Sequence, residues 1–237
     1  MWHHNQGSPC DLTAAKPILF ALEQAGIKVF PNFNTNWHFD DKLGQKYLLE
    51  AIGAPLVPTY VFLNKKAALD WAVSASFPKV FKLRGGAGSA NVQLAKTQRQ
   101  AKKLIRKAFG KGFSNYDAAR SLKERWRLWC LKKTTMADVL KGVVRIVYPP
   151  PFAKTLGRET GYVYFQDFIP NNDHDIRVIV VGNKAFAIKR MVRESDFRAS
   201  GSGHILYDKE NFNNKDIKLA FNNCTTKPRH RTWTLFI

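Results

Sequence analysis

The feature that most constrains this chain is a glycine-rich segment enclosed by two stretches with the pattern of β-strands. Residues 77–92 read FPKVFKLRGGAGSANV and hold Gly85, Gly86 and Gly88. The stretches on either side, 80–83 and 91–94, carry alternating apolar residues, which predicts a strand, a tight loop and a second strand. Backbone N–H groups of such a loop can surround a phosphate, and Lys82 would reach the same anion from the first strand. A glycine-rich hairpin taken alone is more often only a hairpin.

Three known phosphate-binding loops do not fit the segment. A P-loop requires a Lys after its last glycine and then a helix, whereas here a strand follows. The Rossmann pattern GxGxxG is not completed, because Asn91 stands where a third glycine is needed. The protein-kinase loop also lies between two strands, but no HRD or DFG sequence follows it. The segment is therefore best described as a strand–loop–strand unit of another type.

Size and composition indicate a packed protein. The chain has 237 residues, of which 45% are hydrophobic and 13% aromatic, enough for a core in one or two domains. No apolar run approaches the ~20 residues of a membrane span, and the N-terminal residues lack a secretory-signal pattern. Its three separated cysteines form neither a disulfide nor a zinc pattern. These features predict a cytoplasmic protein without a membrane partner.

The net charge of +20 is concentrated in one region. Residues 96–133 hold thirteen Lys or Arg against two acidic residues. Apolar residues recur there at helical spacing, which predicts one helix around 101–109 and another around Trp126 and Trp129, with both tryptophans facing a core. The lysines then form a solvated face, although such a field also attracts polyanions. Binding of nucleic acid therefore stays open, on charge alone.

The remaining pattern predicts alternating helices and strands. Helices are expected at residues 12–25, 41–52, 65–75 and 217–222, and strands at 27–30 and 57–63, with further strands after residue 161. The sequence Gly-Asn-Lys at 182–184 lies between two apolar runs and predicts a β-hairpin.

Residues 164–203 supply a second set of motifs. They read YFQDFIPNNDHDIRVIVVGNKAFAIKRMVRESDFRASGSG, an aromatic strand, a polar turn, Asp-x-Arg, a hairpin, a basic strand and Asp-Phe-Arg-Ala-Ser. With the glycine loop, this order resembles the ATP-grasp superfamily, in particular its glutathione synthetase-like and RimK-type carboxylate–amine ligases. The resemblance covers residues 40–208 and implies a mixed α/β fold in which two α+β lobes clasp a nucleotide.

The resemblance also implies roles for individual residues. Phosphate contacts are expected from Lys42, Lys82 and the loop glycines Gly85, Gly86 and Gly88. Adenine is expected at a linker formed by Gln166, Asp167, Phe168 and Ile169, and the ribose at Asp175. Arg190 and Arg198, with Ser200, occupy places where relatives contact phosphate or an acylphosphate. From the residues alone, Asp175 and Arg177 could equally form a surface ion pair, and Arg198 could be a solvated loop charge.

The chemistry of these relatives explains the residue types. ATP phosphorylates a carboxylate, and an amine then attacks the acylphosphate, so that the protein mainly positions groups and stabilises charge. The resemblance implies ATP and Mg²⁺ as cofactors, and a carboxylate and an amine as substrates. The metal is held by carboxylates near the end of the fold, where this chain offers Asp208, Glu210 and Asp216 and no later acidic residue. We therefore expect no metal site of the family type and poor or absent ligase activity.

The expected domain organisation has three parts. Residues 1–39 are expected to be a remnant of a preceding α/β domain. Residues 40–165 would form the first lobe, with the glycine loop and a basic helical insertion, and residues 166–237 an incomplete second lobe. This organisation predicts a chain truncated at both ends. Besides an ATP-grasp ligase, two functions stay open: a degenerate nucleotide-binding fragment without catalysis, and a basic nucleic-acid-binding protein.

Overall fold

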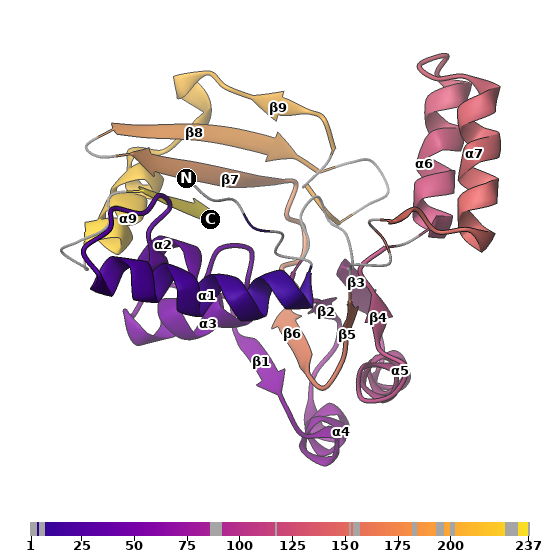
Figure 1. The fold of residues 1–237 in the computed structure, drawn as a ribbon, viewed down its shortest axis with the longest axis horizontal. Helices are drawn as coiled ribbons and strands as arrows, with labels where there is room; N and C mark the ends of the chain where they lie inside the picture. The colour runs from indigo at the N-terminus through magenta and orange to yellow at the C-terminus, as the bar shows by residue number, and fades with distance from the viewer. Residues whose placement is uncertain are drawn as a thin grey trace.

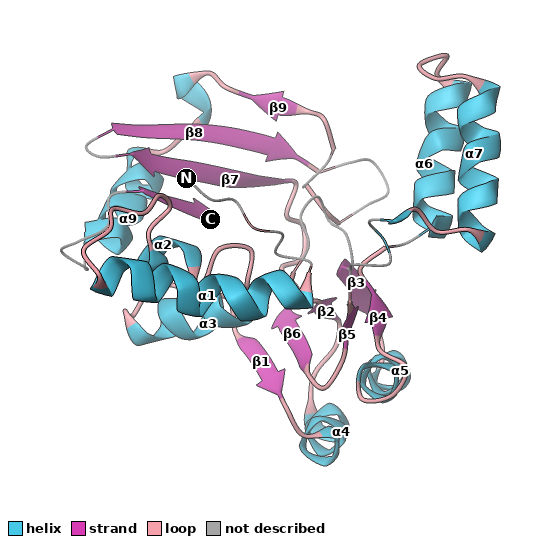
Figure 2. Ribbon diagram, viewed as in Figure 1, coloured by secondary structure: helices cyan, strands magenta, loops and turns pink. Residues whose placement is uncertain are grey.

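The computed structural model describes residues 4, 8–85, 92–116, 118–151, 153, 157–181, 184–192, 197–199, 202–225 and 232–236. Two antiparallel four-stranded sheets, each with helices against it, form the body of the molecule, and a pair of helices stands beside the body (Figures 1 and 2). This is the predicted mixture of two α+β lobes. No helix in the described part of the chain combines the length and hydropathy that a membrane crossing requires.

The first sheet contains the glycine-loop strands. Its order is β1 (Thr59–Phe62), β6 (Val163–Asp167), β2 (Lys79–Lys82) and β3 (Val92–Ala95). β2 and β3 are antiparallel neighbours, with Lys82 opposite Val92, which confirms the strand–loop–strand prediction. The loop residues Gly86 and Gly88 lie outside the described residues.

One face of this sheet packs on two helices. Alternate residues along the strands, among them Phe81 and Phe165, are fully buried against α4 (Lys65–Ser74) and α5 (Gln98–Ala108). The apolar residues of α5 face this core, as their helical spacing predicts, and its basic residues face outward. Because side chains alternate along a strand, the neighbouring Lys82 lies on the opposite face of the sheet.

The second sheet is built around the predicted hairpin. Its order is β10 (Thr232–Phe236), β7 (His174–Val181), β8 (Lys184–Met191) and β9 (Ile205–Leu206). A 3₁₀ turn (Lys209–Asn211) and α9 (Asn214–Thr225) follow β9. Val178 and Val180 pack against Ala220 of α9, so one face of this sheet is covered too.

Three N-terminal helices accompany the sheets: α1 (Pro9–Gln24), α2 (Phe33–Asn36) and α3 (Lys42–Ala51). α1 and α3 agree with the predicted helices. The strand expected at residues 27–30 is wrong, because this segment is an irregular connection in which Ile27 and Phe30 are exposed. A β-like pattern becomes a strand only when another strand offers its hydrogen-bonding edge.

The basic insertion also departs from expectation. The short pair β4 (Phe113–Ser114) and β5 (Arg158–Glu159) is antiparallel, and α6 (Ala118–Cys130) and α7 (Met136–Val147) lie between the two strands in the sequence. The two helices project beside the body in Figure 1. Trp126 is 50% exposed, so its predicted place in a core is wrong, while Trp129 is partly buried.

The C-terminal segment contributes an edge strand to the second sheet. Thr232–Phe236 form β10, antiparallel to β7. Backbone pairing with the edge of β7 accounts for the strand, since ladder hydrogen bonds depend little on side-chain type.

Candidate functional site

The register of the first sheet places Lys82 beside the predicted linker. Val80 lies opposite Gln166, and Lys82 is two residues further along the same face of β2. This diagonal position is within reach of a long side chain, and Lys82 Nζ donates to Gln166 Oε1 at 2.5 Å. Gln166 in turn donates to Thr59 Oγ1 at 3.2 Å. The last residue of β2 and the end of β6 are thus joined on the face opposite α4 and α5.

Lys42 approaches the same place from α3. Asp41 caps this helix by accepting hydrogen bonds from the N–H groups of Leu43 and Gly44. The backbone N–H of Lys42 donates to the carbonyl of Arg84 at 3.0 Å, and its Nζ lies 3.5 Å from the same oxygen. The first turn of α3 is therefore fixed to the segment that leads from β2 into the glycine loop.

Lys42 and Lys82, named here the lysine pair, repel each other and are poorly hydrated. Burial and the positive charge of Lys42 lower the pKa of Lys82 from 10.5 to about 8. Burial also lowers the pKa of Lys42, although Asp40, Asp41 and Glu159 act in the opposite direction. A cation in the first turn of a helix also opposes the helix dipole. An anion bound here would relieve all three costs.

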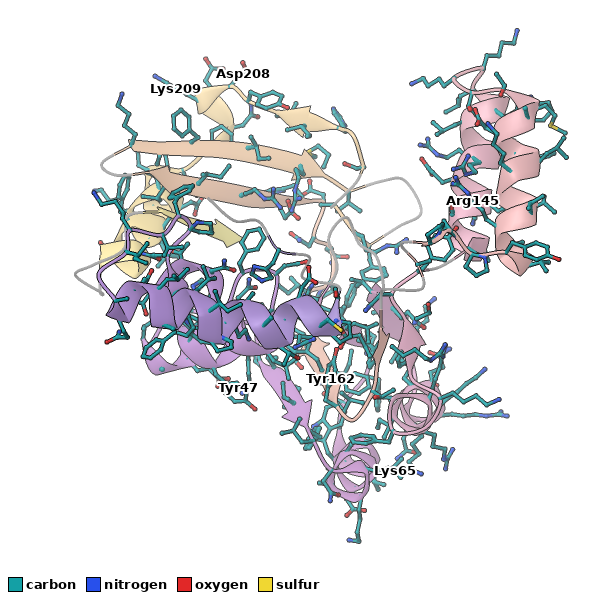
Figure 3. The ribbon with its side chains drawn as sticks, viewed as in Figure 1. Tyr47, Lys65, Arg145, Tyr162, Asp208 and Lys209 are labelled. Atoms are coloured by element: carbon teal, nitrogen blue, oxygen red, sulfur yellow. The ribbon has the colours of Figure 1, made fainter. Side chains whose placement is uncertain are left out.

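A hydrogen-bonded network that the sequence pattern did not predict holds the base of the glycine loop. The N–H of Arg84 donates to the hydroxyl of Tyr162 at 2.6 Å, and this hydroxyl donates to Glu159 at 2.9 Å. Arg84 also lies 3.8 Å from Glu159 and 3.9 Å from Asp41. Figure 3 shows Tyr162 within the first lobe. Because Arg84 precedes Gly85, this network fixes the direction in which the chain enters the loop.

The linker is anchored by a second unpredicted contact. Lys79 Nζ lies 2.5 Å from Asp167 Oδ1, and the two residues are opposite each other on β2 and β6. The Asp167 N–H already donates to the carbonyl of Pro58 at 3.0 Å. Phe168 and Ile169 follow the end of the strand and lie outside its ladder. Their backbone is thus the part of the linker that is not engaged in the sheet.

On the second sheet, Arg190 and Asp175 form a two-pronged ion pair, named here the arginine–aspartate pair. Arg190 Nε and one terminal nitrogen each lie 2.6 Å from a carboxylate oxygen of Asp175. The residues are opposite each other on β7 and β8, on the face away from α9. Arg177 lies on this face as well, and burial and the charge of Arg190 lower its pKa. Asp175, where the resemblance implies a ribose contact, is thus paired with Arg190 within the protein.

Arg198 lies beside the linker. The rings of Phe168 and Phe197 have centroids 6.2 Å apart in an edge-to-face arrangement. The guanidinium carbon of Arg198 is 5.7 Å from the centre of the Phe197 ring. This contact connects the start of the segment between the sheets with the segment after β8. Ser200, predicted next to Arg198, lies outside the described residues.

The predicted site residues that the structure describes lie in three places. Lys42, Lys82 and Gln166 meet near Gly85 on the first sheet, Arg198 lies beside the linker, and the arginine–aspartate pair lies on the second sheet. The residues missed by the sequence analysis were Lys79, Arg84, Glu159 and Tyr162. The isolated Lys79 within an apolar strand was a usable signal, because a charge there needs a partner.

The acidic residues expected near a metal do not gather in the described part of the chain. Asp208 and Glu210 are exposed around the 3₁₀ turn, and Figure 3 shows Asp208 at the outer edge of the second sheet. Among the described residues, no three His, Cys, Asp or Glu side chains are arranged to hold a metal ion.

The sequence matches no protein-family model and no curated protein. Solved structures are similar in fold. A RimK-domain ATP-grasp protein from Sphaerobacter thermophilus has a TM-score of 0.52 and 14% identity, over 93% of this chain and 62% of that chain. D-alanyl-alanine synthetase A from Vibrio cholerae has a TM-score of 0.54 and 14% identity, over 92% of this chain and 57% of that one.

A third similar structure is the ATP-grasp ligase PsnB complexed with a phosphomimetic variant of its minimal precursor, Mg and ADP. It has a TM-score of 0.50 and 14% identity, over 96% of this chain and 54% of that chain. The chain thus spans little more than half the length of these three proteins. The two lobes, the strand–loop–strand unit and these likenesses agree, and the chain has the fold of the ATP-grasp superfamily.

Proposed function

We propose that this chain binds ATP between its two lobes, with the triphosphate on the lysine pair and the glycine loop. The observation that carries the proposal is the partly buried lysine pair at the base of that loop, with the pKa of Lys82 lowered to about 8. Two like charges held close together, one at the end of β2 and one in the first turn of α3, are costly when no anion compensates them. A polyphosphate offers the negative charge that offsets this cost.

In this proposal the adenine contacts the linker. The Asp167 N–H is engaged with Pro58, so the backbone of Phe168 and Ile169 would bind the edge of the base. The hydrogen bond between Lys82 and Gln166 links the phosphate end of the site to the base end. The end of β6 in the first sheet and the start of β7 in the second support a boundary between lobes at residues 165–170.

Arg190 and Arg198 would contact the transferred phosphoryl group or the carboxylate substrate. Arg198 lies beside the linker through Phe197, and Arg190 is held rigidly by Asp175. A guanidinium fixed in this way can orient a carboxylate or a phosphoryl oxygen without a large loss of entropy. Similarity of fold supports ligases that join a carboxylate to an amine as the general class.

The described residues do not fit a Mg²⁺ site. Mg²⁺ needs oxygen ligands in octahedral geometry, and the described acidic side chains form no such group. Lysines supply charge but no coordinating atoms. We therefore propose nucleotide binding as the activity of this chain and expect that Mg²⁺ increases the affinity for ATP only slightly.

Calorimetric titration of ATP into the full chain tests the proposal. Lys82→Ala should weaken ATP binding by about 1.5–3 kcal/mol, roughly 10- to 150-fold, because a charge-assisted contact is lost. Lys65→Ala is the matched control, since Lys65 is exposed at the start of α4, away from the site (Figure 3). Equal ATP affinity in the parent and Lys82→Ala chains would contradict the assignment.

A further inference from the structure

The helical hairpin α6–α7 has a well-defined internal contact. Gly142 allows the helices to approach closely, because an added Cβ there would lie 2.9 Å from Leu122 Cδ1 and from Arg125 Cδ. Arg125 donates to the carbonyl of Asp138 at 3.2 Å, and Val139 is buried. Thr135 caps α7. The hairpin is therefore built as a packed unit.

This contact covers only part of the apolar surface of α7. Leu140 and Val144 are each 58% exposed, and Val147 is 71% exposed. A surface helix normally buries one apolar stripe and leaves polar residues outside, but α7 carries apolar residues on both its covered and its uncovered sides. Contiguous exposed apolar surface of this kind marks an interaction site.

Apolar residues of the two helices, several of them exposed, enclose a groove. Leu122, Lys123 and Trp126 line it from α6, and Met136, Leu140 and Val143 are among those that line it from α7. Its volume is about 580 Å³. In Figure 3 the hairpin, marked by Arg145, projects beside the body. A concave apolar floor between two helices fits the apolar side of a third helix, which presents residues at i, i+3, i+4 and i+7.

The charge around the groove specifies the partner. Residues 118–148 hold eight Lys or Arg and two acidic residues. Both acidic residues are engaged, Glu124 with Arg127 and Asp138 with Arg125 and Lys141. Lys123 lines the groove itself, and Lys132 and Lys133 are exposed in the turn that joins the helices. A basic rim on an apolar floor is complementary to an acidic amphipathic helix.

The same charges argue against other occupants. A second copy of the chain, with a net charge of +20, would bring like charges together around the groove. An anionic membrane would satisfy the lysines, but a flat lipid surface does not fill a concave groove. We propose that the groove between α6 and α7 binds an acidic amphipathic helix of another protein. This binding is independent of the proposed nucleotide site.

Fluorescence anisotropy with the full chain tests this proposal. The probe is a labelled synthetic helix of about 18 residues, five turns long, with Leu at i, i+3, i+4 and i+7 positions and Glu on its other faces. A second peptide carries Lys in place of every Glu. The acidic peptide should bind, with an affinity that falls as salt rises, and the basic peptide should not bind.

Two variants of α7 give a matched pair. Leu140→Glu places a carboxylate in the groove and should weaken binding of the acidic peptide at least about tenfold. Val144→Glu changes a residue of equal exposure that does not line the groove, and should alter binding less than about twofold. Lys123→Glu should weaken binding as well. Circular dichroism would establish that all three variants keep the helical content of the parent.

Two peptide results would overturn the proposal: equal binding of the acidic and basic peptides, or equal effects of Leu140→Glu and Val144→Glu on binding. It would also be overturned by binding to phosphatidylserine vesicles without binding to the acidic peptide, or by self-association that Leu140→Glu abolishes. The last two results would assign the groove to a membrane or to a second copy. ATP affinity should be the same in every variant, so failure here is distinguishable from failure of the nucleotide site.

Discussion

The two sheets carry their cations in opposite ways. In each sheet, one face packs on helices and the other face bears one of the candidate cations, Lys82 on the first sheet and Arg190 on the second. On the second sheet, Arg190 is neutralised within the protein by Asp175 at 2.6 Å. On the first sheet, Lys82 is hydrogen-bonded to the uncharged Gln166 and repelled by Lys42. The charge of Arg190 is therefore compensated within the protein, whereas an external anion would stabilise the charge of Lys82.

This difference distinguishes a cation that stabilises the fold, Arg190, from a cation suited to bind a ligand, Lys82. A buried cation with an internal carboxylate contributes to the rigidity of the fold, and its removal leaves the partner uncompensated. A buried cation without one reduces stability and gains affinity for anions. The comparison predicts that neutralising mutations in the two lobes change stability in opposite directions.

The largest effect is expected in the second lobe. Asp175→Ala should lower the free energy of unfolding by about 3 kcal/mol, because Arg190 is buried and would lose its carboxylate. Urea denaturation measures the change. Asp208→Ala, at an exposed carboxylate of the same lobe, should change stability by less than about 0.5 kcal/mol. Similar losses in both variants would remove the basis of the comparison.

In the first lobe, removing a charge should increase the stability of the chain rather than decrease it. Lys82→Met should raise the free energy of unfolding of the nucleotide-free chain at pH 7 by about 2 kcal/mol, because it removes a poorly hydrated charge and its repulsion by Lys42. A decrease comparable with that of Asp175→Ala would mean that Lys82 is a structural cation like Arg190.

The pH dependence of stability sharpens the same contrast. The pKa of Lys82 is lowered to about 8 in the folded chain from 10.5, so between these values the unfolded state binds more protons. Stability contributed by this group therefore rises with pH from about 8 to 10.5. The advantage of Lys82→Met over the parent should shrink across this window. An advantage that stays constant in urea titrations from pH 7 to pH 10 would refute the lowered pKa.

A smaller effect is expected at the base of the glycine loop. Tyr162→Phe removes the hydroxyl that accepts from Arg84 and donates to Glu159. Loss of these two hydrogen bonds should lower the free energy of unfolding by about 1.5 kcal/mol. ATP affinity should also fall, since Arg84 positions the start of the loop. Tyr60→Phe, in the helix-covered core of the same sheet, serves as the control, and equal losses in the two variants would show that the network does not position the loop.

The sequence was most informative where local pattern decides structure. Alternation along β2 placed Phe81 in the core and Lys82 on the opposite face, and α5 follows from its helical spacing. The contacts at Tyr162 and Lys79 could not be read in this way, because their partners lie 78 and 88 residues away and depend on strand register. Trp126 was misplaced because apolar spacing shows which face is apolar but not whether any element covers it.

Proton uptake on ATP binding tests the central claim most directly. With a pKa of about 8, Lys82 is neutral in about half of the molecules at pH 8. A bound triphosphate would raise this pKa, so Lys82 should take up about half a proton for each ATP bound. Calorimetry in two buffers of different ionisation enthalpy measures this number. The account predicts uptake at pH 8, less uptake at pH 7, and none attributable to this site in Lys82→Met. Binding of ATP with the same proton uptake in the parent and Lys82→Met chains would contradict it.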